Sequence, residues 1–539
     1  MQDSTNKPWL QWYDEKMKNL CLSEVSVYSL LKNTAERFPD HNAIIFEDKL
    51  TDYQTLKKQV DNLAGAWKEM GFKKGEKIGL MMANHPYFII GYYAAHALGL
   101  TVVQVNPLYT LRELLQILKD TQLQYLVFSQ EASKTVGEAQ AEYQFKVRMS
   151  LEKRTEGTKS IHEMIEMNKG LDYTVQINPK EDLALIQYTG GTTGEIKGAM
   201  LTHYNLTSNV MQGIAMYGDS MVPGEEIILL TGPLYHVQAM TASMNTGIYL
   251  GATILLFSKF ELQNVLENIK KYRPTFFGGV PKIYNDFVKY PEIEKYGLDS
   301  LKICTSASAP LPVEIISRFR ELTGIGILEG FGISEASPST HRNPHNKGKI
   351  GSIGIPFPGT ECKIIDDQYN ELAVNEVGEL LVKGPQVMKG YFNNEAETKL
   401  TLRTGWLHTG DLAMMDDEGY FYIVGRKKEM IIVSGFNIYP KEIEEILYEY
   451  PDIKEAAVVG IPSSEFGEEI KAFLVPKDGA NINTDDVKEY CYSKLTRYKV
   501  PKRFEIIQKL PRNTVGKILK RNLIKKENKE IEQEETSII

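Results

Sequence analysis

Helical and strand-like patterns of hydrophobic residues follow one another along the first part of the chain. Residues 56–70 place apolar side chains at helical spacing, whereas residues 77–84 form a short apolar run that is typical of a buried strand. Helical and strand patterns alternate in this way through residues 25–130 and again from 181 to about 340. Strands that alternate with helices predict largely parallel, doubly wound sheets, so we expect an α/β fold.

The pattern changes beyond residue 360. Short apolar runs now stand between Gly and Asp turns, at residues 361–367, 378–384, 390–394 and 405–425. Such runs are typical of a small β-barrel. We therefore predict a large N-terminal domain (1–425) with two βα-layered subdomains plus the barrel. A hinge (426–428) and a smaller, mobile α+β C-terminal domain (429–539) follow.

Length and composition limit the function classes. A chain of 539 residues is long enough for several domains, and its net charge of −8 argues against a nucleic-acid partner. The four cysteines stand far apart without CxxC spacing, which indicates reduced thiols and no zinc site. Small-molecule chemistry is the class that remains.

The most apolar run, residues 88–105, contains His96 and Gln104 and is broken by Gly99. A helix that enters a buried strand fits this run better than a membrane span does. The first residues show no secretory signal pattern, so we expect a cytoplasmic protein. Peripheral contact with the inner face of a membrane and a homodimer both stay open.

The segment 188–203 is the richest in chemistry. Residues 189–195 hold three Thr and three Gly, with Lys197 just beyond. An apolar run precedes them and helical spacing follows, with Thr202 or Asn205 as N-cap, so we expect a loop between a strand and a helix. Its backbone N–H groups, hydroxyls and ammonium could cradle a polyphosphate. Lys197 does not fit a Walker A loop, and composition alone leaves a flexible polar linker open.

Six further segments carry candidate groups. They are PLYHVQAM (233–240), FFGGVPKIY (276–284), TSASAPLP (305–312), GFGISEAS (330–337), TGWLHTGD with GRKKEMIIVSGFNIYP (404–411 and 425–440), and PRNTVGKILKR (511–521). Taken singly, a buried His, an Asp in a turn or a surface Lys is usually structural. The fourth segment approaches the GxSxG nucleophile elbow, but its fifth position is Ala336 and no Asp…His order follows.

In this order the segments resemble the adenylate-forming superfamily, whose phosphate loop is commonly YT(S/T/G)GTTGxPKG. Here Ile196 stands at the usual Pro, and Ser334 at the usual Thr of (Y/F)GxTE. The resemblance is strongest to bacterial long-chain fatty-acid–CoA ligases, supported by VVQVNPLYTLREL (102–114) and VKGPQVMKGYFNN (382–394). It implies ATP-dependent activation of a long-chain fatty acid through an acyl-adenylate to acyl-CoA, with release of pyrophosphate and AMP. A medium-chain or aryl acid ligase and a catalytically silent adenylate-binding paralogue stay open.

The resemblance also implies roles for individual residues. Lys517, Glu335 and Thr189 would be catalytic, and Glu335 and Thr189 would hold Mg²⁺ against the phosphates of ATP. Phe331 would stack on adenine, Asp411 would accept the ribose hydroxyls, and Lys428 would be the hinge pivot. The ATP-binding set is Thr189, Gly190, Gly191, Thr192, Thr193, Gly194, Lys197, Ser308, Ala309, Pro310, Gly330, Phe331, Gly332, Ser334, Asp411, Ile423, Arg426 and Lys517. The set for the acyl group and CoA is His236, Gly278, Gly279, Ser306 and Gly435.

Overall fold

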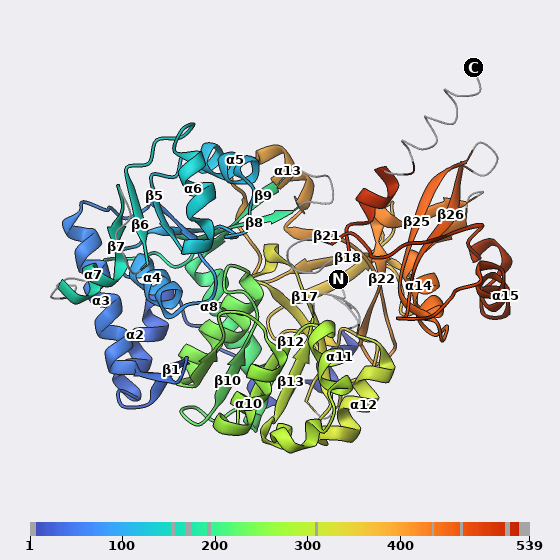
Figure 1. The fold of residues 1–539 in the computed structure, drawn as a ribbon, viewed down its shortest axis with the longest axis horizontal. Coiled ribbons are helices and arrows are strands. Elements are labelled where there is room, and N and C mark those ends of the chain that lie inside the picture. The colour runs from blue at the N-terminus through green and yellow to red at the C-terminus, as the bar shows by residue number, and fades with distance from the viewer. Residues whose placement is uncertain are drawn as a thin grey trace, which may run out of the picture. The chain divides into compact units, whose positions relative to one another are not determined.

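The computed structural model shows an α/β protein (Figure 1). It describes residues 7–151, 157–167, 170, 175–190, 196–307, 311–345, 347–433, 436–463, 467–512, 518–525 and 527. The chain divides into two compact units. The first is Met1–Cys362, Val382–His408 and Glu418–Tyr420, and the second is Lys363–Leu381, Thr409–Asp417 and Phe421–Ile539. Each unit is considered by itself below.

An eight-stranded sheet forms one half of the first unit, in the order β19-β9-β8-β4-β3-β5-β6-β7. Its strands are β3 (Lys77–Met81), β4 (Thr101–Gln104), β5 (Tyr125–Phe128), β6 (Val147–Ser150), β7 (Lys159–Ser160), β8 (Leu183–Gly190), β9 (Ile196–Thr202) and β19 (Gly390–Tyr391). From β8 to β7 all neighbours pair in parallel, whereas β9 pairs antiparallel with both β8 and β19. The parallel core of this sheet confirms the predicted βα layering.

Helices surround this sheet: α3 (Tyr53–Glu69), α4 (Pro86–Ala97), α5 (Leu111–Thr121), α6 (Ser133–Ala139) and α7 (Ile161–Met167). Helix α5 shows why the sequence folds this way. Thr110 and Glu113 form a reciprocal capping box at its start, and Gln122 adopts a left-handed conformation at its end. Its buried Leu114 and Leu118 join Val103 and Leu126 in one apolar cluster. A cap of this kind contributes about 1 kcal/mol, and the buried apolar face contributes more.

A nine-stranded sheet forms the other half, in the order β16-β15-β14-β13-β12-β10-β11-β1-β2. Its strands are β1 (Asn42–Phe46), β2 (Lys49–Asp52), β10 (Ile227–Leu230), β11 (Thr253–Leu256), β12 (Phe276–Gly279), β13 (Ile303–Ser306), β14 (Ile327–Gly332), β15 (Ser339–Arg342) and β16 (Ile355–Pro356). Strands β14 to β1 along this order are parallel, and both edges are antiparallel.

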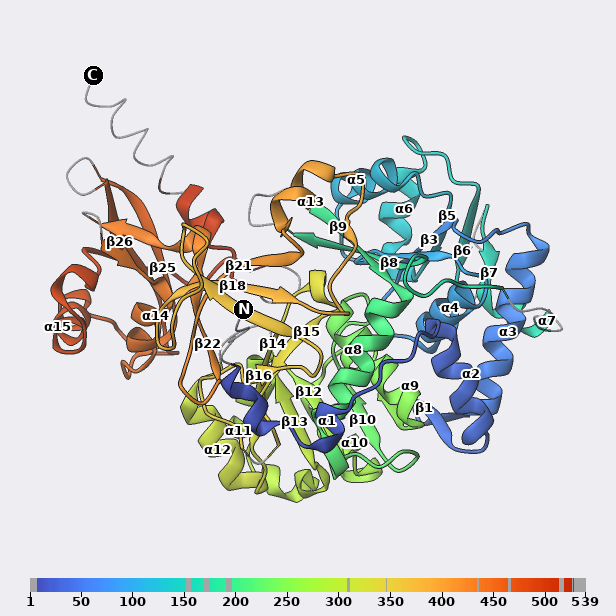
Figure 2. The ribbon, with the colours of Figure 1, turned by 180° about the vertical axis from the view of Figure 1, so that it is seen from behind.

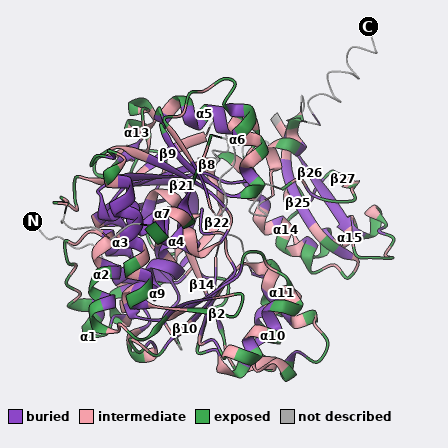
Figure 3. Ribbon diagram, turned by 60° about the vertical axis from the view of Figure 1, so that its left-hand side comes forward, coloured by how far each residue is buried: buried purple, intermediate pink, exposed green. Residues whose placement is uncertain are grey.

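The helices of this half are α1 (Glu15–Lys18), α2 (Val27–Arg37), α8 (His203–Ala215), a π-helix η4 (Gln238–Asn245), α9 (Thr246–Leu250), α10 (Leu262–Tyr272), α11 (Pro281–Lys289) and α12 (Val313–Thr323). Helix α8 lies between the two large sheets (Figure 2). It follows directly from β9, almost all its residues are buried, and Asn209 on it exchanges hydrogen bonds of 2.8 and 3.1 Å with Ser339 of β15. Most strands of the two sheets consist largely of buried residues (Figure 3).

A five-stranded sheet has the order β17-β18-β21-β20, with β22 paired to β21. Its strands are β17 (Glu361–Ile365), β18 (Gly378–Lys383), β20 (Leu402–Arg403), β21 (Trp406–Met415) and β22 (Phe421–Arg426). The barrel predicted for this region included residues 390–394, and that part was wrong. Gly390 and Tyr391 form β19, which pairs with β9 of the eight-stranded sheet. Helix α13 (Glu395–Thr401) follows β19.

The end of the chain forms another five-stranded sheet, β24-β23-β26-β25 with β27 on β26. Its strands are β23 (Ile431–Val433), β24 (Phe436–Ile438), β25 (Ile453–Ser463), β26 (Gly467–Pro476) and β27 (Arg503–Ile506), and its helices are α14 (Pro440–Tyr448) and α15 (Thr484–Lys494). Ile443, Leu447, Val458 and Ala472 belong to its apolar core. The α+β character and the helix near residue 484 agree with the sequence prediction.

Among the described residues, no helix is both long enough and apolar enough to cross a membrane. The apolar run at 88–105 instead supplies most of α4 and then β4, separated by Gly99 with φ +69°. This arrangement is the predicted helix entering a buried strand.

Candidate active site

The Gly/Thr-rich segment belongs to a hairpin, which corrects the predicted strand–loop–helix unit. β8 and β9 pair antiparallel, with Thr189 opposite Lys197 and Gly190 opposite Ile196. Helix α8 begins only at His203, where the Thr202 side chain accepts a 3.1 Å bond from the backbone N–H of Asn205. Thr202 is therefore the N-cap, as predicted. Gly191, Thr192, Thr193 and Gly194 lie outside the described residues.

The cross-strand pairing determines the directions of two side chains that were predicted to bind phosphate, Thr189 and Lys197. Directly opposed residues of an antiparallel pair project from the same face, so Thr189 and Lys197 share one face of the hairpin. The Lys197 ammonium forms an ion pair with Glu397 of α13, and its side chain is only 14% exposed. It also lies 5.5 Å from the ring centroid of Tyr391. The hairpin thus presents a hydroxyl and an ammonium beside each other.

Glu335 lies in a 3₁₀ turn, Ser334–Ala336, that follows β14. Its backbone carbonyl accepts a 2.8 Å hydrogen bond from the N–H of Met388, and its side-chain Oε1 accepts a 2.8 Å bond from the hydroxyl of Tyr391. Tyr391 therefore contacts both Lys197 and Glu335. The structure brings three predicted phosphate and metal groups (Thr189, Lys197 and Glu335) into one neighbourhood of the first unit.

β14 carries Gly330, Phe331 and Gly332, each opposite a residue of β15. The Phe331 ring is half-buried and meets His341 edge to face, with 6.2 Å between centroids. Its partial exposure is what the predicted stacking on adenine needs. Ser308, Ala309 and Pro310, the other adenine candidates, lie outside the described residues.

Gly332 of β14 lies close to the backbone just before β15. A Cβ there would lie 2.4 Å from the carbonyl oxygen of Pro338. We expect Gly332→Ala to lower the free energy of unfolding by roughly 1–3 kcal/mol, since backbone must move to admit the methyl group. Chemical denaturation measures this loss. Gly326→Ala is the matched control because no atom lies within 4 Å of its Cβ, and an equal loss in both variants would contradict the prediction.

The predicted acyl residues lie on three elements of the first unit. Gly278 and Gly279 on β12 pair with Thr305 and Ser306 on β13, and His236 precedes the π-helix. A Cβ on Gly278 would lie 3.4 Å from Thr305 Oγ1 and 3.5 Å from Ser243 Oγ. The two glycines and Ser306 are therefore brought together on neighbouring strands. The π-helix, which carries Ser243, was not foreseen in the sequence.

His236 is half-buried, and loss of solvation lowers its pKa to about 4. No described group hydrogen-bonds its Nε2 atom. The ring is consequently neutral near pH 7 and places a polar atom in apolar surroundings, which suits a contact with a substrate.

Three histidines of the first unit with lowered pKa values predict how stability depends on pH. Burial lowers the pKa of His203 and His236 to about 4 and that of His341 to about 3. The ordinary value is about 6.5, so between there and the lowered values the unfolded chain binds protons that the folded chain does not. We expect the free energy of unfolding to fall on acidification from about pH 6.5, by about 1 kcal/mol per pH unit for each histidine.

Chemical denaturation at about pH 7 and about pH 5 measures this slope above the range in which most carboxylates titrate. His236→Gln should reduce the slope by one histidine's share. Stability that stays constant or rises over this interval would contradict the expected sign.

The second unit holds Asp411, the predicted ribose ligand, and Arg426, which was predicted to bind ATP. Asp411 on β21 and Arg426 on β22 are cross-strand partners, and Arg426 Nε lies 2.7 Å from Asp411 Oδ1. Ile423 lies three residues before Arg426, and its carbonyl accepts a 2.7 Å hydrogen bond from Lys441 Nζ. The Asp411 carboxylate is almost fully buried, so its charge is balanced by Arg426.

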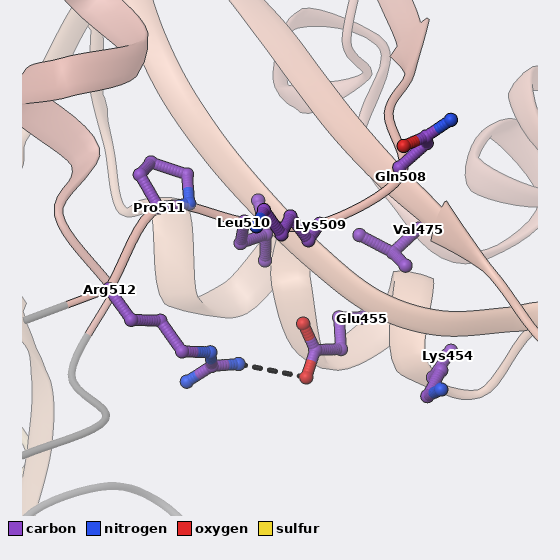
Figure 4. A pocket seen from close by; sticks show the side chains of 8 residues that line it. All are labelled: Lys454, Glu455, Val475, Gln508, Lys509, Leu510, Pro511 and Arg512. Carbon is purple, nitrogen blue, oxygen red and sulfur yellow. Dashed lines mark hydrogen bonds and ion pairs between the residues drawn. The ribbon is translucent and has the colours of Figure 1, made fainter.

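The hinge candidate Lys428 lies in the exposed 3₁₀ turn Lys427–Glu429. Gly435 and Lys517 lie outside the described residues. The chain on either side of 513–517 is anchored: Arg512 forms a β-bridge with Ile518 and an ion pair of 2.8 Å with Glu455 (Figure 4). A pocket of about 610 Å³ lies beside that ion pair, and none of the predicted site residues that the structure describes lines it.

The first unit offers Mg²⁺ a hydroxyl and a carboxylate. Both are hard oxygen donors, and the described residues contain no group of three or more His, Cys, Asp and Glu that could hold a metal ion. Mg²⁺ is commonly bound by one or two protein oxygens together with substrate phosphates and waters. Thr189 and Glu335 fit that mode, in which ATP supplies most of the ligands.

The chain is similar to known proteins over nearly its whole length. A family model described as AMP-binding enzyme matches residues 31–392, and one described as AMP-binding enzyme C-terminal domain matches residues 442–517. A long-chain-fatty-acid–CoA ligase of Bacillus subtilis (strain 168) is 40% identical, covering 97% of this chain and 98% of that protein. A second, from Salmonella typhimurium (strain LT2), is 36% identical, covering 92% and 94%.

A solved structure gives the same picture. The crystal structure of ATP-bound MatB from Rhodopseudomonas palustris superposes with a TM-score of 0.85 at 27% identity, covering 93% of this chain and 99% of that one. The whole-chain similarity agrees with the fold described above. The chain belongs to the AMP-binding enzyme family, whose members form adenylates from ATP.

Proposed function

We propose that this protein is a long-chain fatty-acid–CoA ligase that uses ATP, Mg²⁺ and CoA. The observation that carries the proposal is the neighbourhood of Thr189, Lys197 and Glu335, in a chain whose relatives named above are long-chain ligases. A hydroxyl, an ammonium and a carboxylate suited to Mg²⁺ form a set that can hold a triphosphate.

The reaction has two steps. A fatty carboxylate oxygen attacks the α-phosphorus of ATP, and the bond to pyrophosphate breaks. The thiol of CoA then loses its proton and attacks the acyl carbon, and AMP leaves. A carboxylate is a poor electrophile, and joining it to phosphate first provides a leaving group.

The residues proposed for the first step reduce the repulsion between the two negatively charged reactants. The carboxylate and the α-phosphate repel each other, so cationic groups and hydrogen-bond donors must stabilise the transition state. Lys197 and Lys517 would supply ammonium groups, and Glu335 and Thr189 would hold Mg²⁺, which neutralises phosphate charge when bound. Asp411 would bind the ribose, Arg426 the ribose or a phosphate, and Phe331 the adenine.

The proposed acyl contacts are His236, Gly278, Gly279 and Ser306. The neutral His236 ring and the missing side chains of the glycines suit an apolar chain that ends in a polar group. Residues 426–428 remain the proposed hinge, with Lys428 as the pivot, and Gly435 would contact CoA.

Release of pyrophosphate and formation of acyl-CoA, measured with acids from acetate to oleate, test this function. We expect both products, with kcat/KM rising toward the long chains. A maximum with medium-chain or aryl acids would reject the substrate class. Pyrophosphate without thioester would reject CoA as acceptor, and binding of ATP without turnover of any acid would indicate a silent paralogue.

A further inference from the structure

Tyr391 occupies a position that the backbone fixes closely. Its short strand β19 pairs with β9, with Tyr391 opposite Ala199. The N–H of Lys389 donates to Met200 O at 2.9 Å, and that of Phe392 to Gly198 O at 2.8 Å. The N–H of Tyr391 itself donates to Thr398 Oγ1 at 2.8 Å. All three N–H groups are thus engaged, so the direction of the Tyr391 side chain is set by β9 and α13.

Gly390, just before it, has φ +147°, and a Cβ there would lie 2.7 Å from Thr398 Cγ2. The close approach of α13 to β19 therefore depends on a glycine. Helix α13 in turn carries Glu397, whose N–H is capped by Asn394 Oδ1 at 3.0 Å and whose carboxylate pairs with Lys197. One short segment, 390–398, holds the groups that contact both Lys197 and Glu335.

The Tyr391 side chain makes two different contacts. Its hydroxyl donates to Glu335 Oε1 at 2.8 Å, and its ring faces the Lys197 ammonium at 5.5 Å. No described residue hydrogen-bonds the other carboxylate oxygen of Glu335. A carboxylate can only accept a hydrogen bond, so the Tyr391 hydroxyl is the donor in this contact.

We propose that Tyr391 is a positioning residue for nucleotide-bound Mg²⁺: its hydroxyl fixes the Glu335 carboxylate, and its ring keeps Lys197 beside it. The hydrogen bond to Oε1 of Glu335 leaves Oε2 to face a cation. It also restricts rotation of the Glu335 carboxylate before the metal binds, so less side-chain entropy is lost on binding. The proposal rests on the proposed function for the identity of the nucleotide. Tyr391 itself touches neither substrate nor metal.

Tyr391→Phe tests the hydroxyl alone, because the ring and its packing stay. Calorimetric titration of the full chain with ATP is done once with Mg²⁺ and once with EDTA. We expect Kd for MgATP to rise about tenfold, since a hydrogen bond to a charged group is lost, and Kd for metal-free ATP to change less than twofold. Tyr391→Leu, which also removes the ring from Lys197, should weaken ATP binding under both conditions.

Tyr28→Phe is the matched control, since the Tyr28 hydroxyl donates to Asp61 at 2.6 Å in the same unit, away from the predicted site residues. It should leave both dissociation constants unchanged. Equal MgATP affinity in Tyr391→Phe and wild type, or an equal loss with and without Mg²⁺, would overturn the proposal.

The titration also separates this inference from the proposed function. A wild-type protein that binds MgATP but converts no acid would refute the ligase function, while the comparison of Tyr391→Phe with wild type would still decide the role of Tyr391. A wild-type protein that binds no MgATP would overturn both.

Discussion

Lys517→Ala is expected to slow formation of the acyl-adenylate by about 10²–10³-fold while the protein remains folded. The step joins two anions, and an ammonium aimed at the charge that develops there stabilises the transition state more than the ground state. The second step starts from an acid that is already activated. Thioester formation from added acyl-adenylate and CoA should therefore change less than threefold, about 0.7 kcal/mol in the barrier.

The lysines nearby make this a sharp comparison. Lys520, three residues on, is half-buried and forms ion pairs with Glu444 at 2.7 Å and Glu429 at 3.4 Å, so its charge is already paired within the second unit. Lys525 is exposed on the same helical segment, and Lys525→Ala serves as the control with unchanged rates. Pyrophosphate release by Lys517→Ala within a factor of three of wild type would remove Lys517 from the chemistry.

The fold was predictable where one pattern decided it. The alternation of strands and helices indicated parallel sheets because each strand needs both faces covered. The pattern failed at β9 (Ile196–Thr202), which pairs with β8 as a strand. The sequence AMLTHYNL (199–206) fits helical spacing throughout, but the helix begins only at His203. Short apolar runs cannot be assigned by periodicity alone, and here pairing with both β8 and β19 decided the outcome. The pairing of β9 with β19 joins residues almost 200 positions apart, so no local sequence pattern could predict it.

The site was predictable as a set of groups but not as a set of contacts. Thr189, Lys197 and Glu335 were identified from their segments, and the structure places them near one another in the first unit. Tyr391 and Glu397 were missed as functional residues. Tyr391 lies in the segment that supported the resemblance, but its partner Glu335 is 56 positions earlier. A tyrosine beside a strand signal more often indicates packing, so only the fold could reveal its role.

The charged groups of the candidate site already have partners within the protein. Lys197 pairs with Glu397, and Arg426 pairs with Asp411. Each ion pair neutralises a charge that is partly removed from water. Removing one partner of a buried pair typically costs about 3–5 kcal/mol of stability. Binding of a nucleotide would therefore exchange partners, and the net affinity is the difference between two sets of contacts.

Glu335→Gln is the second variant with a large expected effect. The amide keeps the shape and an oxygen that can accept the Tyr391 hydrogen bond, but it removes the negative charge that Mg²⁺ requires. We expect kcat/KM for ATP to fall about 10²-fold, roughly 2.7 kcal/mol of transition-state stabilisation, and the half-saturating Mg²⁺ concentration to rise. Initial rates of pyrophosphate release across a Mg²⁺ series measure both. Glu449→Gln is the control, because Glu449 also accepts a phenol hydrogen bond, from Tyr490 at 3.1 Å, on the exposed surface of the second unit. If Glu335→Gln keeps the Mg²⁺ dependence of that control, the carboxylate does not hold the metal, and Tyr391 positions it for some other purpose.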